Sequence, residues 1–321
     1  MMHFSNFFSL NINGHEDIDF VDVNLETDIR LFIDPCLIEL ADDSFSKECT
    51  AVINSFFKSI FDCCISKNDK KLYALLDFGH EPNETKLGLS RNQSSGRGAS
   101  PEILFDIFKR VTRDNLIGDG LVKNPMDLCL FIENFAEDRM SDLITNVLRK
   151  NLHDFTKSQC NEHEIPLSKT KEVLGSYWNP ITLSWETLED YPLKAGNLTL
   201  ILVPKTIVRP KYVYSVGRYL QHKILCERQD YHQANGTSLA KVKHDKHGNI
   251  EYGKPSKKSI YEAEVKGTKH KQYAETYSRE NLAALIDFRK LMSQKSLLLK
   301  IRLTDEVIDR IVYRRLLSIA S

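Results

Sequence analysis

Residues 131–160 read Phe-Ile-Glu-Asn-Phe-Ala-Glu-Asp-Arg-Met-Ser-Asp-Leu-Ile-Thr-Asn-Val-Leu-Arg-Lys-Asn-Leu-His-Asp-Phe-Thr-Lys-Ser-Gln-Cys, and the rest of the chain is organised around them. The apolar run from Leu128 to Phe135, which leads into this stretch, predicts a strand. An acidic corner follows at residues 137–139. From Ser141 to Gln159 apolar residues recur at helical spacing, which predicts one long amphipathic helix.

The two faces of this predicted helix differ in chemistry. The apolar face carries Met140, Ile144, Val147, Leu148 and Phe155. The opposite face combines acids, an amide, a guanidinium and an imidazole, from Asp138, Asp142, Thr145, Asn146, Arg149 and His153. Such a polar stripe could hold a metal ion and a phosphate. It could equally be the solvent-facing side of an ordinary amphipathic helix.

Length and composition limit the class of protein. A chain of 321 residues has room for two domains or one large one. No apolar run approaches the roughly 18 residues of a transmembrane helix, and the first residues lack the pattern of a signal peptide. The seven cysteines are scattered and odd in number. We therefore expect a cytoplasmic protein with reduced thiols and no membrane partner.

The hydrophobic patterns predict an α+β protein in two parts. Residues 1–165 should form a mixed sheet packed by helices, as a catalytic domain with acidic corners. Residues 166–321 should form a smaller sheet and a basic, largely helical region. Besides those already described, strands are expected at 19–25, 28–34, 72–78, 178–185 and 197–208, and helices at 46–66, 101–113, 216–229, 280–293 and 304–319.

Acidic residues stand at the ends of several of these elements. Asp34 precedes Pro35, which cannot continue a central strand, so Asp34 should lie where a strand ends. Carboxylate oxygens are the ligands that Mg²⁺ prefers, and metal charge assists phosphodiester cleavage. The predicted ligands of Mg²⁺ or Mn²⁺ are Asp34, Glu81, Glu84, Asp138 and Asp142. Each acid could instead cap a helix or begin a turn.

Around that metal site we expect catalytic and phosphate-binding groups. The predicted catalytic residues are Asp34, Glu84, Asp138, Arg139 and Asp142. Arg91 and Arg97 could hold phosphate bidentately. The glycine- and serine-rich segment 92–100, which precedes the helix expected from Pro101, could form a phosphate cradle or an ordinary surface loop.

Charge is unevenly distributed along a chain of zero net charge. Residues 1–50 carry 11 acidic and 2 basic residues, whereas residues 241–271 carry 9 lysines and 4 acidic residues. The basic segment predicts a surface for nucleic acid or a nucleotide, with nearby tyrosines able to stack on bases. The predicted contacts are Lys254, Lys257, Lys258 and Lys266. The alternatives are a solvated basic face, or attraction between acidic and basic regions of one chain, of a homo-oligomer or of a protein partner.

Two resemblances bear on function. Glu264-Val265-Lys266, with Asp245 or Glu251 upstream, resembles the restriction-endonuclease-like nuclease core, in which the acids bind metal and the lysine positions the attacking water. The same residues follow Pro255-Ser256, a good helix start, where Glu262 and Lys266 would be an i,i+4 pair. The corners at 32–35, 80–88 and 138–142 resemble uncharacterised bacterial proteins associated with mobile elements and phage defence.

Together these patterns support two hypotheses about function. The first is a metal-dependent phosphodiesterase or nuclease-like hydrolase that acts on nucleic acid or nucleotide, in bacterial defence. The second is a non-catalytic module that binds nucleic acid or protein through its basic C-terminal half. The spatial arrangement of the carboxylates discriminates between them.

Overall fold

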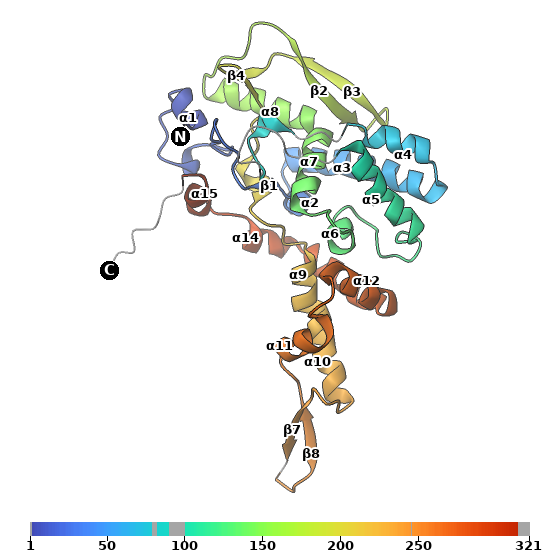
Figure 1. The fold of residues 1–321 in the computed structure, drawn as a ribbon. Helices are drawn as coiled ribbons and strands as arrows, with labels where there is room; N and C mark the ends of the chain where they lie inside the picture. The colour runs from blue at the N-terminus through green and yellow to red at the C-terminus, as the bar shows by residue number, and fades with distance from the viewer. Residues whose placement is uncertain (1, 79–81, 90–99, 245, 314–321) are drawn as a thin grey trace, which may run out of the picture. The chain divides into compact units, whose positions relative to one another are not determined.

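Figure 1 shows the structure, a computed structural model that describes residues 2–78, 82–89, 100–244 and 246–313. It is a mostly helical α+β protein, with 53% helix and 13% strand. The chain forms two compact units, each assembled from separate segments. The boundary predicted near residue 165 lies within the first of them. Unit 1 comprises 1–115, 135–212 and 294–321, and unit 2 comprises 116–134 and 213–293.

The α+β class is confirmed, but the mixed sheet expected in the N-terminal half is wrong. Within the described residues each sheet has two antiparallel strands. One sheet joins distant segments, because Phe32 pairs with Arg209 and Ile33 with Val208. The sheets are β1 (Phe32–Ile33) with β6 (Val208–Arg209), β2 (Glu172–Asn179) with β3 (Ser184–Asp190), β4 (Leu193–Ala195) with β5 (Leu198–Leu200), and β7 (Lys241–His244) with β8 (Ile250–Gly253).

Helices make up most of unit 1. Side-chain caps set several helix starts, since Asp34, Asp43, Asn68 and Ser100 each accept a hydrogen bond from a backbone N–H two or three residues on. The helices are α1 (Phe4–Phe7), α2 (Pro35–Leu40), α3 (Ser44–Ser66), α4 (Asp69–Leu76), α5 (Pro101–Arg113), α7 (Glu137–Val147), α8 (Arg149–Glu162), α14 (Leu298–Ile301) and α15 (Asp305–Val312), with short 3₁₀ turns at His15–Asp17, Asn83–Thr85, Lys205–Ile207 and Lys295–Leu297.

Several element predictions need correction. The segment 72–78 lies mostly in α4, and the run from Leu128 to Phe135 begins inside a helix. Both are short apolar runs, which periodicity alone cannot assign to a buried strand or a buried helix. The long helix predicted from 141 to 159 is two helices, α7 and α8, that meet at Leu148.

Other predictions are confirmed wholly or in part. Helices do occupy 46–66 and 101–113. The apolar run Leu200–Val203 is buried as expected, but only Leu200 belongs to a strand. In the segment 304–319 the helix α15 ends at Val312, and residues 314–319 lie outside the described part.

Unit 2 is helical apart from its hairpin. Two of its turns are π-helical, with hydrogen bonds one residue wider than those of an α-helix. In Figure 1 the β7–β8 hairpin extends beyond α10 and α11 at one end of the unit. The helical elements are α6 (Asp127–Phe131), α9 (Val216–Tyr219), the π-helix η4 (Leu220–Ile224), α10 (Leu225–Ala234), α11 (Lys257–Ile260), the π-helix η5 (Tyr261–Val265), α12 (His270–Glu280) and α13 (Leu282–Met292).

Asp127 joins the two segments of unit 2. Its carboxylate is completely buried and accepts hydrogen bonds from the backbone N–H groups of Lys123 and Asn124, at 2.8 and 3.0 Å. The Tyr214 hydroxyl donates to it at 2.6 Å, and the Arg289 guanidinium donates twice, at 2.9 and 3.1 Å. Burial and the adjacent Asp127 carboxylate raise the pKa of Tyr214 well above its ordinary value.

Glu264 lies in a second polar network of unit 2, and it is not part of a nuclease strand. It accepts two hydrogen bonds from Arg228, at 2.7 and 2.8 Å, and further ones from Tyr273 and His232. Ser256 caps the helix that precedes it. Glu264 therefore holds α10, η5 and α12 together, and the resemblance to a nuclease core finds no strand here.

The cysteines lie mostly in the interior of the protein. All seven cysteines are free thiols, and six of them are buried. Burial raises the pKa of Cys64 to about 11 and that of Cys160 to about 12, so neither forms the reactive thiolate at neutral pH. Among the described residues, every helix is too short or too polar to cross a lipid bilayer.

Candidate functional site

The polar stripe that the sequence places on one side of α7 and α8 is buried, except for Asp138, which is partly exposed. Thr145, Asn146, Arg149 and His153 are at most 5% exposed, and Asp142 is 8% exposed. The interpretation as an ordinary solvent-facing side is therefore wrong. Buried polar groups require partners, because an unpaired one costs about 1–3 kcal/mol. The stripe is accordingly built into the interior of unit 1.

Arg149 is the centre of this buried stripe. Its Nη1 donates to Glu84 Oε1 at 3.0 Å and to the carbonyl of Leu174 at 2.9 Å, while Nη2 donates to Asn146 Oδ1 at 2.8 Å. Its Nε has no hydrogen-bond partner among the described atoms. Gly175 makes room for the guanidinium, since a Cβ there would lie 3.0 Å from Nε. Arg149 thus links α7, α8 and β2 to the segment around Glu84.

The chain segments that carry the predicted acids adjoin one another. The backbone N–H of Ile33, next to Asp34, donates to Ser141 Oγ on α7 at 3.0 Å. A Cβ placed on Gly88 would lie 3.9 Å from Asp138 Oδ1. The end of β1, the start of α7 and the segment 84–88 therefore come together in unit 1.

The acids themselves differ in environment. Asp34 is completely buried and caps α2 through a 2.9 Å hydrogen bond from the N–H of Cys36. Burial raises the pKa of Asp138 above its ordinary value, although the neighbouring Arg139 acts in the opposite direction. Glu84 is committed to Arg149, and the carbonyl of Asp142 accepts from Asn146.

The described residues contain no group of three acidic, histidine or cysteine side chains arranged to hold a metal ion. Glu81 lies outside the described residues, so the five-residue magnesium or manganese set stays a prediction. Arg91 and Arg97, the predicted phosphate ligands, also lie outside them. What the structure adds is the adjacency of the segments that carry Asp34, Glu84 and Asp138.

The four lysines of unit 2 that the sequence predicts as nucleic-acid contacts differ in their partners. Lys254 is ion-paired with Asp230, and Lys266 with Glu262 in the i,i+4 arrangement expected on a helix. Lys257 donates to the carbonyl of Gln221. Lys258 is exposed and makes no ion pair with any described acid.

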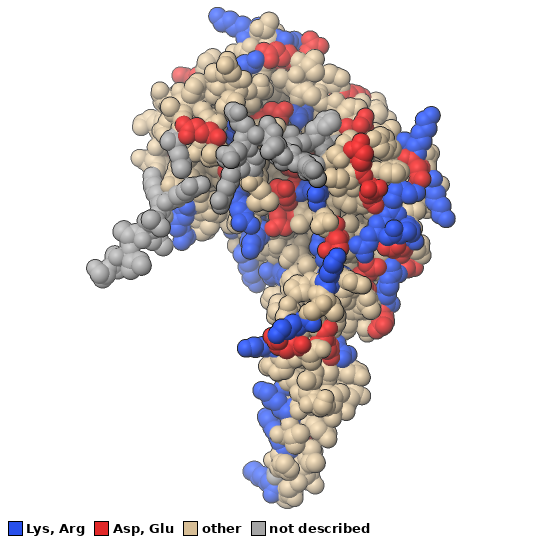
Figure 2. All heavy atoms as spheres, in the orientation of Figure 1, with Lys and Arg blue, Asp and Glu red and all other residues tan. Residues whose placement is uncertain are grey.

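The β7–β8 hairpin adds cations that sequence reasoning did not single out. Lys241, Lys243 and Lys246 are exposed, and none is paired with an acid in the described chain. In Figure 2 the end of unit 2 that carries the hairpin shows lysine or arginine side chains and no acidic ones on the face in view. The sequence contains these lysines in Lys-Val-Lys-His, but only the hairpin register shows that Lys241 and Lys243 share one face.

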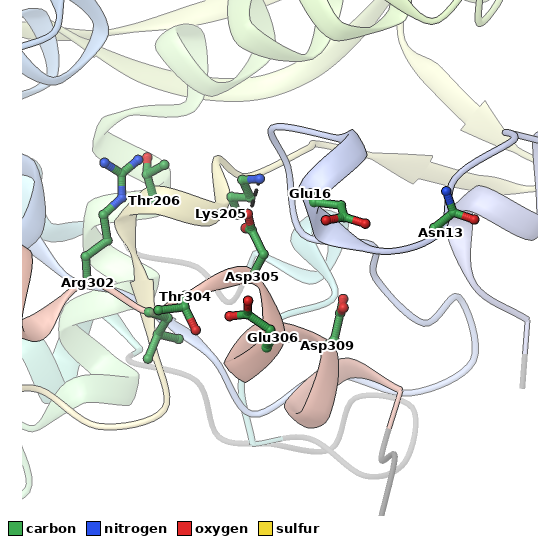
Figure 3. Close-up of a pocket in the computed structure, with 10 residues that line it drawn as sticks. Asn13, Glu16, Lys205, Thr206, Arg302, Thr304, Asp305, Glu306 and Asp309 are labelled. Carbon is green, nitrogen blue, oxygen red and sulfur yellow. Dashed lines mark ion pairs between the residues drawn. The ribbon is translucent and has the colours of Figure 1, made fainter. Parts of the chain in front are cut away.

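A pocket of about 510 Å³ lies in unit 1 beside α15 (Figure 3). Asn13 and Glu16 line one side, and the acidic side chains of α15 line the other. Lys205 forms an ion pair with Asp305 at 2.9 Å. The pocket could not be predicted from sequence patterns, because its walls come from three distant segments, 13–16, 205–206 and 302–309.

Asp309, which lines the pocket, is paired with a buried histidine behind it. His15 is fully buried, and its Nδ1 lies 2.6 Å from Asp309 Oδ1. Its Nε2 accepts the backbone N–H of Asp22 at 3.0 Å, so Nδ1 carries the proton and donates it to Asp309. Burial lowers the pKa of His15, against the raising effect of Asp309. Because both ring nitrogens are occupied, the pair anchors α15 and cannot act as a general base.

Comparison with known proteins gives one match. The model of a family described as a domain of unknown function (DUF8370) matches residues 9–215. The match covers most of unit 1 and ends before the hairpin of unit 2. No curated protein and no solved structure matches the chain.

Proposed function

The chain belongs to the DUF8370 family, and we propose that it binds nucleic acid through the basic surface of unit 2. The observation that carries the proposal is the set of exposed lysines on and beside the β7–β8 hairpin, which are not neutralised by described acids. The set comprises Lys241, Lys243, Lys246 and Lys258. Unpaired cations of this kind bind a polyanion by displacing its counterions, irrespective of base sequence.

The hairpin lysines differ from three paired lysines of unit 1. On unit 1, Lys58, Lys109 and Lys150 are each ion-paired with an aspartate, at 2.5–2.9 Å. A paired lysine offers little net charge to a phosphate. Exposed lysines without a described acidic partner also occur on unit 1, at Lys67, Lys70 and Lys71. The hairpin differs from the three paired sites in that its lysines keep their net charge, and this supports it as the surface for nucleic acid.

The test is a titration of labelled oligonucleotide at several salt concentrations. The wild-type affinity should fall steeply with increasing salt. The variant with Lys241, Lys243 and Lys258 changed to glutamine should bind more weakly whatever the base sequence of the oligonucleotide. Each lost phosphate contact should reduce the slope of log affinity against log salt by about 0.9. The matched control changes Lys58, Lys109 and Lys150 to glutamine and should leave the slope unchanged. Absence of binding at low salt would reject the proposal.

A second candidate is the metal-dependent phosphodiesterase, and a specific observation favours it. The segments bearing Asp34, Glu84 and Asp138 adjoin one another around the buried stripe of α7 and α8. The required metal set would include Glu81 and take Mg²⁺ or Mn²⁺. The resemblance of these corners to proteins of mobile elements and phage defence supports a defensive role for such an activity.

This candidate predicts cleavage of DNA or RNA in magnesium or manganese, and none in EDTA. Asp142→Asn should reduce cleavage by more than about 100-fold, since even outer-shell partners of a metal contribute that much. It should also remove the rise in melting temperature on adding metal. Asp154→Asn, on the exposed side of α8, is the control. Full metal response and cleavage in Asp142→Asn would exclude this site.

A further inference from the structure

The β7–β8 hairpin has two chemically different faces. Its register pairs Val242 with Tyr252 and His244 with Ile250, and successive pairs in a ladder point to opposite faces. Val242, His244, Ile250 and Tyr252 therefore share one face. Lys241, Lys243 and Glu251 share the other. No ion pair joins Lys243 to Glu251, its neighbour across the strands.

The apolar face is open to solvent. Val242 is 59% exposed, Ile250 is 58% exposed and Tyr252 is 41% exposed. A two-stranded hairpin normally needs packing against another element for its stability, and neighbouring exposed apolar side chains mark interaction surfaces. The apolar face is therefore suited to a partner that covers it.

The structure holds Tyr252 in a fixed position. One side of its ring lies against Gly236, where a Cβ would come within 2.6 Å of the ring. The carbonyl of Tyr252 accepts a hydrogen bond from Gln233 Nε2 at 3.0 Å. The hairpin is thus seated on the end of α10, and Tyr252 is presented as a preorganised aromatic platform.

Charge identifies the kind of partner. The reverse face and the turn supply Lys241, Lys243 and Lys246, so the partner carries negative charge as well as flat apolar surfaces. A single-stranded nucleic acid has both, in its phosphates and its unpaired bases, whereas a duplex hides the faces of its bases. We propose that the β7–β8 hairpin binds single-stranded nucleic acid, with bases on the Val242, Ile250 and Tyr252 face and phosphates on these lysines.

This inference rests on the proposed nucleic-acid binding and adds the class of strand and the residues that touch bases. The test compares a fluorescent 20-nucleotide single strand, as DNA and as RNA, with the matching duplex by anisotropy at low salt. The wild type should prefer the single strand. Tyr252→Ala should weaken that binding about 5- to 150-fold, the range expected for one stacked base, without changing the salt slope.

Two further variants keep the test independent of folding. Tyr252→Phe preserves the ring and its seat on Gly236, and it should retain wild-type affinity. Val242→Ser leaves Tyr252 in place and should weaken single-strand binding while duplex binding stays the same. Changing Lys241 and Lys243 to glutamine should instead lower the salt slope for both kinds of strand.

The outcomes separate this inference from the function on which it rests. Equal affinity for single strand and duplex, with Tyr252→Ala binding like wild type, would overturn the inference and leave nucleic-acid binding intact. No binding of either strand would overturn both. Polyglutamate serves as a competitor that carries charge but no bases. If it displaces the labelled single strand as effectively as an unlabelled oligonucleotide, the surface is purely electrostatic. Self-association lost in Val242→Ser would mean that a second copy covers the face. Either of these last two results would overturn the role of the apolar face.

Discussion

Replacing Arg149 with methionine should lower the free energy of unfolding of unit 1 by about 3–5 kcal/mol, the usual cost of removing one partner from a buried ion pair. The side chain is 6% exposed and bonds to Glu84, Asn146 and the carbonyl of Leu174. Methionine can replace the aliphatic stem but leaves those acceptors without their donor. Urea denaturation followed by tryptophan fluorescence measures the change, because both tryptophans of the chain, Trp178 and Trp185, belong to unit 1.

The neighbouring residue supplies a matched control. Lys150 is half-exposed and pairs with Asp154 on the surface of α8. Lys150→Met should therefore change the unfolding free energy by less than about 1 kcal/mol. If Arg149→Met unfolded at the wild-type urea concentration, the buried stripe would contribute no net stability, and a purely functional reason for its burial would be needed.

In unit 2, Asp127→Ala should lower the free energy of unfolding by a similar amount, about 3–5 kcal/mol. The substitution removes a carboxylate that accepts five hydrogen bonds. The Arg289 guanidinium and the Tyr214 hydroxyl would then lose this acceptor in the interior of the unit. Hydrogen–deuterium exchange of peptides from α6 and α13 measures the effect locally. A loss of about 3 kcal/mol corresponds to exchange roughly 100-fold faster where exchange follows unfolding.

Asp287 on α13 provides the comparison for this experiment. Its side chain is 54% exposed and pairs with Lys223, so Asp287→Ala should leave the protection of both helices nearly unchanged. Asp127→Asn keeps the shape of the side chain and removes its charge. Its exchange protection should lie between that of Asp127→Ala and that of Asp287→Ala. Unchanged protection in Asp127→Ala would show that the two segments of unit 2 are held together by apolar packing alone.

Local signals in the sequence predicted local structure well. Ser256 caps a helix as expected, the helix predicted from Pro101 begins there, and Asp34 lies where β1 ends. Such signals depend on residues only a few positions apart. The periodicity of residues 141–159 correctly grouped Asp142, Asn146 and Arg149 on one side of the helical segment. Information of this kind is contained in a short window of sequence.

The contacts between distant segments could not be predicted from short stretches of sequence. Nothing in residues 141–159 indicates that Glu84 and Leu174 would surround Arg149, so burial of the polar face could not be foreseen. Strand pairing likewise depends on partners such as Phe32 and Arg209, which are far apart in the chain. The acids of the candidate site were chosen by their place at element ends. Their neighbours in space come from packing that local patterns do not encode.

The pairing of His15 with Asp309 has a consequence for how the protein is made. The two residues are 294 positions apart, so the ribosome must synthesise everything between them before they can meet. Closing so long a loop costs little more entropy than closing a shorter one, because the cost grows only with the logarithm of length. The consequence is a delay in folding. Until residues 305–312 emerge from the ribosome, His15 lacks its partner Asp309 and α15 is absent. The second segment of unit 2 is synthesised during that interval, so unit 1, although begun first, is completed last.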